Sequence, residues 1–160
     1  MTQTIEQAVD YSKLKVVATR IFAAPRALVF RMWTDPAHVA RWWGPHGFTN
    51  PVCRIDARAG GAIHIDMRAP DGTVYPMSGT FREVVAPERL SFASAALGAD
   101  GKPMFETLTT VTFSERDGQT TQTLEAKVLW LTPGAERYLG GMEQGWMETL
   151  ERLAAEVSAQ

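Results

Sequence analysis

The sequence predicts an α+β fold in which a curved antiparallel sheet of about six or seven strands surrounds a long C-terminal helix. In residues 133–157, apolar residues recur at steps of three or four, which is the spacing of one face of a helix. Short segments rich in β-branched residues, separated by tight-turn dipeptides, fill the middle of the chain. Because tight turns join antiparallel neighbours and a one-sided sheet needs a cover, we expect the final helix to pack across the sheet.

Length and composition predict one domain. A chain of 160 residues with 45% apolar content is large enough for a conventional core. We expect residues 1–12, which are polar and unpatterned, to form a flexible arm, and residues 13–157 to form the domain. The net charge of −2 gives no electrostatic reason to expect a nucleic-acid partner. Without a signal-peptide pattern or an apolar run of bilayer length, we expect a cytoplasmic protein and no membrane partner.

The first third of the chain predicts one strand followed by two short helices. The apolar, β-branched run Leu14–Phe22 is typical of a strand. Apolar residues within Pro25–Trp33 predict the first short helix. The second is expected over Ala37–Trp43, with Asp35 as its N-terminal cap and Pro36 at its first position.

Six further strands are predicted before the final helix. The turns between them carry glycine pairs, Asp-Gly dipeptides or proline, which are typical of hairpins. In the second of these strands Ile63, Ile65 and Met67 alternate with polar residues, so one face of the sheet is expected to be dry and the other wet. The expected strands are Val52–Ala57, Ala62–Ala69, Thr73–Val85, Leu90–Ala95, Met104–Ser114 and Thr121–Leu131.

The final helix is expected to begin at Pro133, a residue suited to the first helical position, with Thr132 as its cap. Its interior glycines each disfavour the helix by about 1 kcal/mol relative to alanine. If the glycine pair at 140–141 loosens a turn, the firm helix begins nearer Met142. If Gly145 faces the sheet, its missing side chain allows a strand to approach closely.

The sequence resembles a known family in several segments. These are RIFAAPRALVF at 20–30, WTDP at 33–36, WWGPHGF at 42–48, DARAGG at 56–61, DG at 71–72, PERL at 87–90, and GW at 145–146 with Thr149, Leu150 and Leu153. They are similar to the activator of Hsp90 ATPase homologue (AHSA1-like) family of the SRPBCC, or START and Bet v 1-like, superfamily. The resemblance covers residues 13–157 and implies the helix-grip fold of that superfamily.

This resemblance implies a function but leaves three alternatives open. Members include small proteins regarded as binders of hydrophobic ligands, as well as cyclases, self-resistance proteins and a eukaryotic co-chaperone. We expect binding of a hydrophobic or aromatic small molecule in a cavity between the C-terminal helix and the sheet. The alternatives are a cyclase- or hydrolase-like enzyme that uses polar groups in that cavity, and an Hsp90-type co-chaperone or stress-response interaction protein. The oligomeric state, including a homodimer, also remains open.

Aromatic residues, methionines and one histidine make up the predicted cavity lining. Of Trp42-Trp43, we expect one ring to fill the core and the other to line the cavity mouth, although both could simply close one end of the sheet. His46 lies in a loop, near a ligand or simply in solvent. Later in the final helix, Leu150, Leu153 and Val157 should hold the sheet. The predicted lining residues are Trp43, His46, Phe48, Met67, Tyr75, Met77, Phe81, Phe92, Tyr138, Met142 and Trp146.

The sequence gives little support for catalysis. No histidines or carboxylates have metal-ligand spacing and no phosphate- or dinucleotide-binding motif occurs, so we expect no metal and no cofactor. Cys53 is expected to be a buried, unreactive thiol. The enzyme alternative needs polar groups whose neutral form is favoured by apolar surroundings. Its candidates, which on alternating strands can equally point to water, are Tyr75, Glu106, Thr107, Glu125 and Tyr138.

Overall fold

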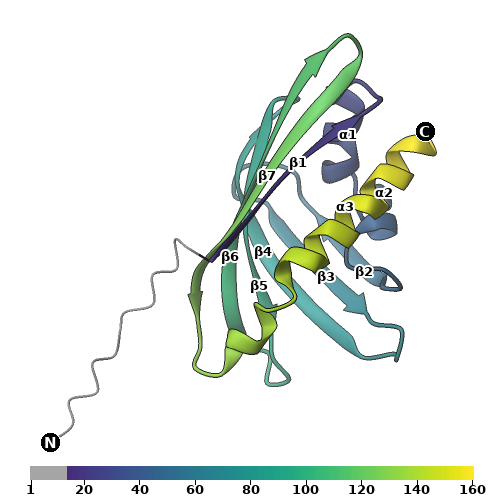
Figure 1. The fold of residues 1–160 in the computed structure, drawn as a ribbon. Coiled ribbons are helices and arrows are strands. Elements are labelled where there is room, and N and C mark those ends of the chain that lie inside the picture. The colour runs from purple at the N-terminus through teal and green to yellow at the C-terminus, as the bar shows by residue number, and fades with distance from the viewer. Residues whose placement is uncertain (1–13) are drawn as a thin grey trace, which may run out of the picture.

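The structure, a computed structural model, describes residues 14–160 apart from the side chains of Arg137 and Tyr138. Within this part of the chain, seven strands form one antiparallel sheet, and three α-helices lie on one of its faces (Figure 1). We call the face covered by the helices the inner face. The predicted α+β architecture, a curved sheet around a C-terminal helix, is confirmed. The predicted N-terminal arm lies outside the described residues.

The strands form a meander to which the first strand adds at the far edge. Along the sheet their order is β1-β7-β6-β5-β4-β3-β2, and every neighbouring pair is antiparallel. Their boundaries differ from the predicted ones by a few residues. The strands are β1 (Lys15–Phe22), β2 (Thr49–Ile55), β3 (Ala62–Arg68), β4 (Val74–Val85), β5 (Arg89–Leu97), β6 (Pro103–Arg116) and β7 (Gln119–Leu131).

Two short helices follow β1, as predicted. They are α1 (Arg26–Thr34) and α2 (Pro36–Trp42). Asp35 caps α2, because its carboxylate oxygen accepts a hydrogen bond from the Ala37 N–H at 2.9 Å, and Pro36 occupies the first turn, where a missing N–H is tolerated. This cap places α2 directly after α1 on the same face of the sheet.

The final helix, α3 (Met142–Ser158), begins at Met142, the start expected if the glycine pair at 140–141 loosens a turn, and not at Pro133. The reason is local: Gly134 adopts a left-handed conformation with a φ of 87°, which a continuing helix cannot contain. A single 3₁₀ turn, η2 (Ala135–Tyr138), follows instead. The Thr132 hydroxyl donates to the Met104 carbonyl at 2.9 Å and does not cap a helix. The 17 residues of α3 therefore span about 26 Å.

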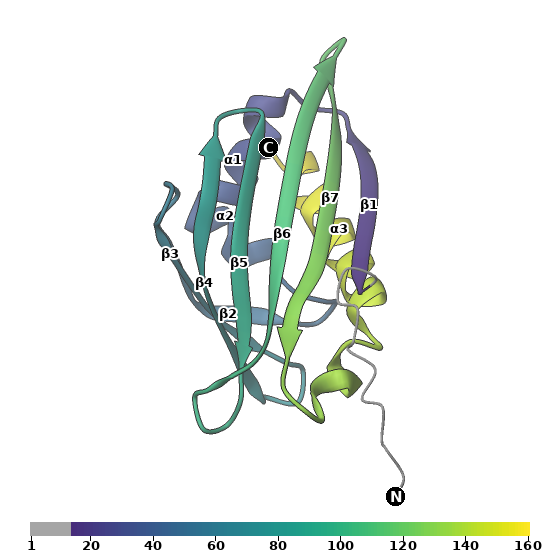
Figure 2. The same cartoon turned by 90° about the vertical axis from the view of Figure 1, so that its left-hand side faces the viewer.

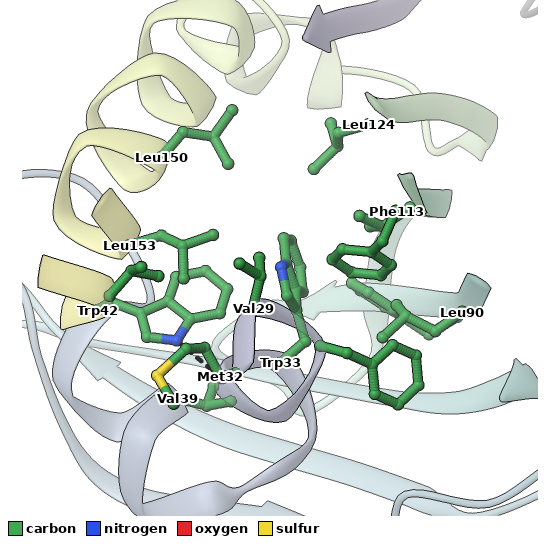
Figure 3. Packing of buried hydrophobic residues seen from close by; sticks show 14 of the residues in the cluster. Val29, Met32, Trp33, Val39, Trp42, Leu90, Phe113, Leu124, Leu150 and Leu153 are labelled. Atoms are coloured by element: carbon green, nitrogen blue, oxygen red, sulfur yellow. Dashed lines mark hydrogen bonds between the residues drawn. The ribbon is translucent and has the colours of Figure 1, made fainter. Parts of the chain in front are cut away.

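The core lies between the inner face of the sheet and one side of each helix. Leu90, Val111 and Leu124 are in register across β5, β6 and β7, and all three are fully buried. Leu150 and Leu153 of α3 point towards this row, with side chains of α1 packed between them (Figure 3). Together with the buried Val157, they hold α3 on the sheet, in the place predicted for them.

The opposite face of the sheet is the wet one. Figure 2 looks onto this face, with the helices behind the strands. On β3, Ile63 and Ile65 are buried, whereas His64 and Asp66 between and beyond them are partly exposed. His64 bonds on this face through one ring nitrogen to the Ser78 hydroxyl at 3.0 Å, and through the other to Asp66 at 2.9 Å. The predicted alternation of dry and wet faces is therefore confirmed for β3.

Candidate functional site

A cavity of about 420 Å³ lies between the start of α3 and the inner face of the sheet. Its walls come from three parts of the chain: the loop of residues 43–48 after α2, strands β3 to β6, and the first turns of α3. Aromatic residues and methionines are the commonest residue types in the wall. They are Trp43, Phe48, Met67, Tyr75, Met77, Met104, Phe105, Met142 and Trp146.

The loop wall turns sharply so that two of its aromatic rings face the cavity. Gly44 makes this turn with a φ of 95°, a conformation that side chains rarely adopt. A Cβ atom at this position would also lie only 3.2 Å from the Met67 Cε and the Phe48 Cβ. The Asn50 side-chain amide then holds the loop from behind, by donating to the Trp43 carbonyl at 2.9 Å. The fixed turn places Trp43 and Phe48 on the cavity wall.

Arg152 ties this loop to α3. Its Nη1 lies 2.8, 3.0 and 3.1 Å from the carbonyl oxygens of Trp43, Gly44 and Pro45, and its Nη2 lies 2.8 Å from that of Arg41. Burial lowers the pKa of the Arg152 guanidinium below its usual value. The sequence analysis did not identify Arg152, because its partners are backbone carbonyls more than 100 residues away, which leave no side-chain signal.

His46 lies beside the cavity and is not part of its lining. Its side chain is 55% exposed, and its Nε2 lies 2.9 Å from a carboxylate oxygen of Glu151. Its backbone N–H donates to Glu148 at 3.0 Å. The pKa of Glu148 is lowered, first by a hydrogen bond from the Gln144 side chain and then by this backbone N–H. His46 thus joins the loop to α3 from the solvent side, and its predicted place on the cavity wall is wrong.

The aromatic wall is continuous with the core. The Trp43 and Trp146 rings meet edge to face, with centroids 5.7 Å apart and planes at 85°. Trp146 also stacks on Trp33 of α1 at 6.4 Å. Trp42 is fully buried and donates its ring N–H to the Met32 carbonyl at 3.0 Å (Figure 3). The Trp42-Trp43 pair is therefore divided as the sequence analysis expected, with one ring in the core and one on the cavity.

A family model described as activator of Hsp90 ATPase homolog 1-like protein matches residues 23–158. The chain belongs to this family. The resemblance identified from the sequence is thereby confirmed. A comparison with curated proteins finds none that matches this chain.

Solved structures of similar proteins share the fold of this AHSA1-like protein. A crystal structure of a Nitrosomonas europaea protein is 28% identical, with a TM-score of 0.77, and the match covers 92% of this chain and 96% of that one. An Arthrobacter aurescens protein is 26% identical, with a TM-score of 0.81 and coverage of 94% and 90%. The AHSA1 protein from Silicibacter pomeroyi is 25% identical, with a TM-score of 0.77 and coverage of 91% and 98%. The predicted helix-grip fold is therefore shown by these neighbours as well.

Most of the predicted lining residues lie on the cavity of the AHSA1-like protein. The structure brings together Trp43, Phe48, Met67, Tyr75, Met77, Met142 and Trp146. Phe81 and Phe92 lie instead on a second void of about 20 Å³, which Trp43 and Met77 separate from the cavity. The side chain of Tyr138 lies outside the described part of the chain.

Gly145 also lines the cavity, and the close strand contact considered for it does not form. We expected it to let a strand approach if it faced the sheet. The nearest atom to a Cβ built on Gly145 is the Pro45 Cγ, at 3.9 Å, so no strand packs against it. Its missing side chain instead leaves space in the cavity.

Three hydroxyl groups supply the polar part of the lining, besides the Tyr75 phenol. Ser94 and Thr107 are register partners on β5 and β6, and their hydroxyl oxygens lie 3.4 Å apart. Thr149 donates its hydroxyl to the Gly145 carbonyl at 2.7 Å. The sequence analysis missed Ser94 and Thr149, although Ser94 has the same strand parity as Phe92 and could have been found from it.

The cavity offers little for acid–base chemistry. Among the described lining residues, the Tyr75 phenol is the one ionisable group. Glu106 and Glu125, candidates of the enzyme alternative, do not line the cavity, whereas Thr107 does. Cys53 lies outside the cavity and is partly buried, not fully buried as expected. This partial burial raises the pKa of its thiol to about 11. The described residues contain no cluster of three His, Cys, Asp or Glu that could hold a metal ion.

A membrane-spanning helix was not expected from the sequence. Within residues 14–160, no helix combines the length and apolar character needed to cross a bilayer.

Proposed function

We propose that this AHSA1-like protein binds a hydrophobic or aromatic small molecule in the cavity between α3 and the sheet. The cavity of about 420 Å³, walled by aromatic rings and methionines, carries the proposal. Its volume falls in the range of about 300–1,000 Å³ that small-molecule sites occupy. A ligand that fills it removes apolar surface of both partners from water, which is the main source of affinity for such ligands.

The methionines of the wall allow the cavity to adapt its shape to a ligand. Met67, Met77, Met104 and Met142 all line the cavity. Thioether side chains are unbranched and polarisable, so they fill irregular gaps and make favourable contacts with aromatic rings. Trp43 and Trp146 supply large rigid surfaces on the same wall. This combination supports an aromatic or alicyclic ligand.

Neither alternative has a comparable supporting observation. An enzyme of the expected kind needs two converging ionisable groups, and the described lining residues provide the Tyr75 phenol alone. An Hsp90-type partner needs a contiguous patch on the outer face. There the exposed Val17 and Ile21 of β1 lie opposite Glu125 and Thr121 of β7, so polar groups interrupt the apolar surface at this edge.

The proposal is tested by filling the cavity without disturbing the fold. Gly145→Leu places a side chain in the cavity, where nothing lies closer than 3.9 Å to its Cβ, and it replaces glycine by a better helix former. We expect the wild-type protein to bind the uncharged fluorophore N-phenyl-1-naphthylamine. Because the leucine occupies ligand space, the variant should bind it at least about tenfold more weakly.

The matched control adds the same side chain to the exposed side of the helix. Ala155 is exposed, so Ala155→Leu should leave the affinity for the fluorophore unchanged. Native mass spectrometry of freshly purified wild-type protein should also show a co-purified mass that is absent from Gly145→Leu. Equal binding by both leucine variants, or no binding by a folded wild-type protein, would overturn the proposal.

A further inference from the structure

We propose that the ligand is electrically neutral and carries a hydrogen-bonding group that meets the hydroxyl pair of Ser94 and Thr107. This inference rests on the proposed function and specifies its ligand class. It places the apolar body of the ligand against Trp43 and Trp146, and its polar group against the sheet. An aromatic or alicyclic alcohol, phenol or ketone has this chemistry.

The charge of the lining argues for a neutral ligand. Among the described residues that line the cavity, none carries a carboxylate, an ammonium, a guanidinium or an imidazole. An ionised group that leaves water for an apolar cavity loses its hydration and finds no opposite charge to replace it. A carboxylate or an ammonium on the ligand would therefore be strongly disfavoured inside.

The surroundings of the cavity do not reverse this preference. The N-terminus of α3 lies at the cavity wall and would by itself favour an anion, but Glu143 in its first turn already places a carboxylate there. The cation of Arg152 donates to four backbone carbonyls, those of residues 43–45 in the loop and that of Arg41 in α2. Glu148 and Glu151 on the same helix add further negative charge.

The hydroxyl pair has unused hydrogen-bonding capacity. Ser94 and Thr107 carry one proton each, and their mutual contact at 3.4 Å uses at most one of them. One donor and several lone pairs remain for a ligand. The third lining hydroxyl, that of Thr149, spends its proton on the Gly145 carbonyl within its own helix.

A buried hydroxyl lies beside this pair but does not line the cavity. Thr109 follows Thr107 on the same face of β6 and is 1% exposed. Its hydroxyl oxygen has no hydrogen-bond partner among the described residues. Because Thr109 is not on the cavity wall, the contact with the ligand is assigned to Ser94 and Thr107 alone.

Four naphthalenes that differ in one substituent test the charge preference. We would measure the affinity of the folded protein at pH 7 for 2-methylnaphthalene, 2-naphthalenemethanol, 2-naphthoate and 2-naphthylmethylammonium. Both neutral probes should bind. The two ions should bind at least about tenfold more weakly than the alcohol, because each would lose its hydration unpaired. An ion that binds as tightly as the alcohol would overturn the neutral-ligand inference.

Removing the hydroxyl pair tests its contact with the ligand. Ser94→Ala with Thr107→Val keeps the apolar shape of the wall. It should weaken binding of the alcohol by about threefold to tenfold, the usual net value of one hydrogen bond. It should leave binding of 2-methylnaphthalene unchanged or tighter. Thr110→Val, which removes a hydroxyl from the other face of β6, should change neither affinity.

The outcomes separate this inference from the proposed function. If both neutral probes bind but the double variant affects them equally, the hydroxyl pair does not recognise the ligand and the cavity still binds apolar molecules. If none of the probes binds to a folded wild-type protein, the proposed function and the inference fail together. Thermal denaturation of each variant verifies that the protein under test is folded.

Discussion

At the scale of single residues, Arg152 holds the loop wall of the cavity against α3. Its guanidinium reaches from α3 to three carbonyls of the loop that carries Trp43, and to the Arg41 carbonyl at the end of α2. The guanidinium spreads five N–H donors over a rigid planar fork, whereas a lysine ammonium carries three donors on one atom and cannot reach carbonyls that lie as far apart as these. The position of the loop wall therefore depends on the shape of this side chain as well as on its charge.

We predict that Arg152→Lys lowers the free energy of unfolding by about 2 kcal/mol, because several hydrogen bonds from a charged donor to partly buried carbonyls are lost while the charge remains. Urea denaturation measures this change. Arg31→Lys is the matched control: the Arg31 side chain is 68% exposed and lies 3.9 Å from Asp35, so its loss should be within about 0.5 kcal/mol. Equal losses in the two variants would contradict the proposed role of the fork.

Cys53 gives a prediction about pH. Burial raises the pKa of its thiol to about 11, whereas an unfolded cysteine titrates near about 8.5. Below about pH 8.5 the thiol is neutral in both states, so its contribution to stability is fully present. As the pH rises from there towards 11, the unfolded chain loses this proton first and the contribution is lost.

The same shift predicts slow alkylation of Cys53. At pH 8.5 the folded protein should react with iodoacetamide far more slowly than the urea-unfolded chain, because the thiolate is the reacting form. Mass spectrometry of timed samples measures both rates, and the unfolded chain serves as the control. Similar rates in the two states would show that the folded protein neither shields the thiol nor raises its pKa.

At the scale of elements, α1 is joined to the distant strand β7 by one buried hydrogen bond. The Trp33 ring N–H donates to the Gln122 side-chain oxygen at 2.8 Å, and both residues are buried. The Gln122 Nε2 has no partner among the described residues. This bond orients Trp33, against which Trp146 of the cavity wall stacks.

A double-mutant cycle measures this link. Trp33→Phe and Gln122→Leu should each destabilise the protein, since each leaves a buried polar group of the other without a partner. The double variant should lose less than the sum of the two, by about 1 kcal/mol or more. Denaturant unfolding of the four proteins gives the coupling. Simple additivity would show that the hydrogen bond contributes nothing to the packing of α1 on β7.

At the scale of the whole molecule, the cavity arises because the two ends of α3 pack differently against the sheet. Its later turns, with Leu150, Leu153 and Val157, are buried on the sheet. Its first turns stand opposite β4, β5 and β6 (Figure 1). The cavity lies between them, and Met142 and Trp146 line it on the helix side. A straight helix and a curved sheet cannot mate along their whole length, so burial at one end leaves space at the other.

Local patterns in the sequence determined the elements and most of the cavity wall. Strand alternation fixes which side chains face inwards, so the sequence alone assigns Met67, Tyr75 and Met77 to the inner face. Helical periodicity likewise separated Trp146 from the charged side of α3. These features depend on neighbours within a few residues, which is the range that sequence patterns describe.

Only the tertiary structure decided which inward-facing side chains reach the cavity and which contacts hold the loop wall in place. Phe81 shares its face of β4 with Met77, yet the structure places it on the smaller void, because depth depends on where α3 crosses the sheet. His46 stays outside the cavity and Arg152 binds the loop because of contacts between segments that lie more than 100 residues apart in the sequence. Residue type and parity do not encode such contacts; they follow from the packing of the helix against the loop.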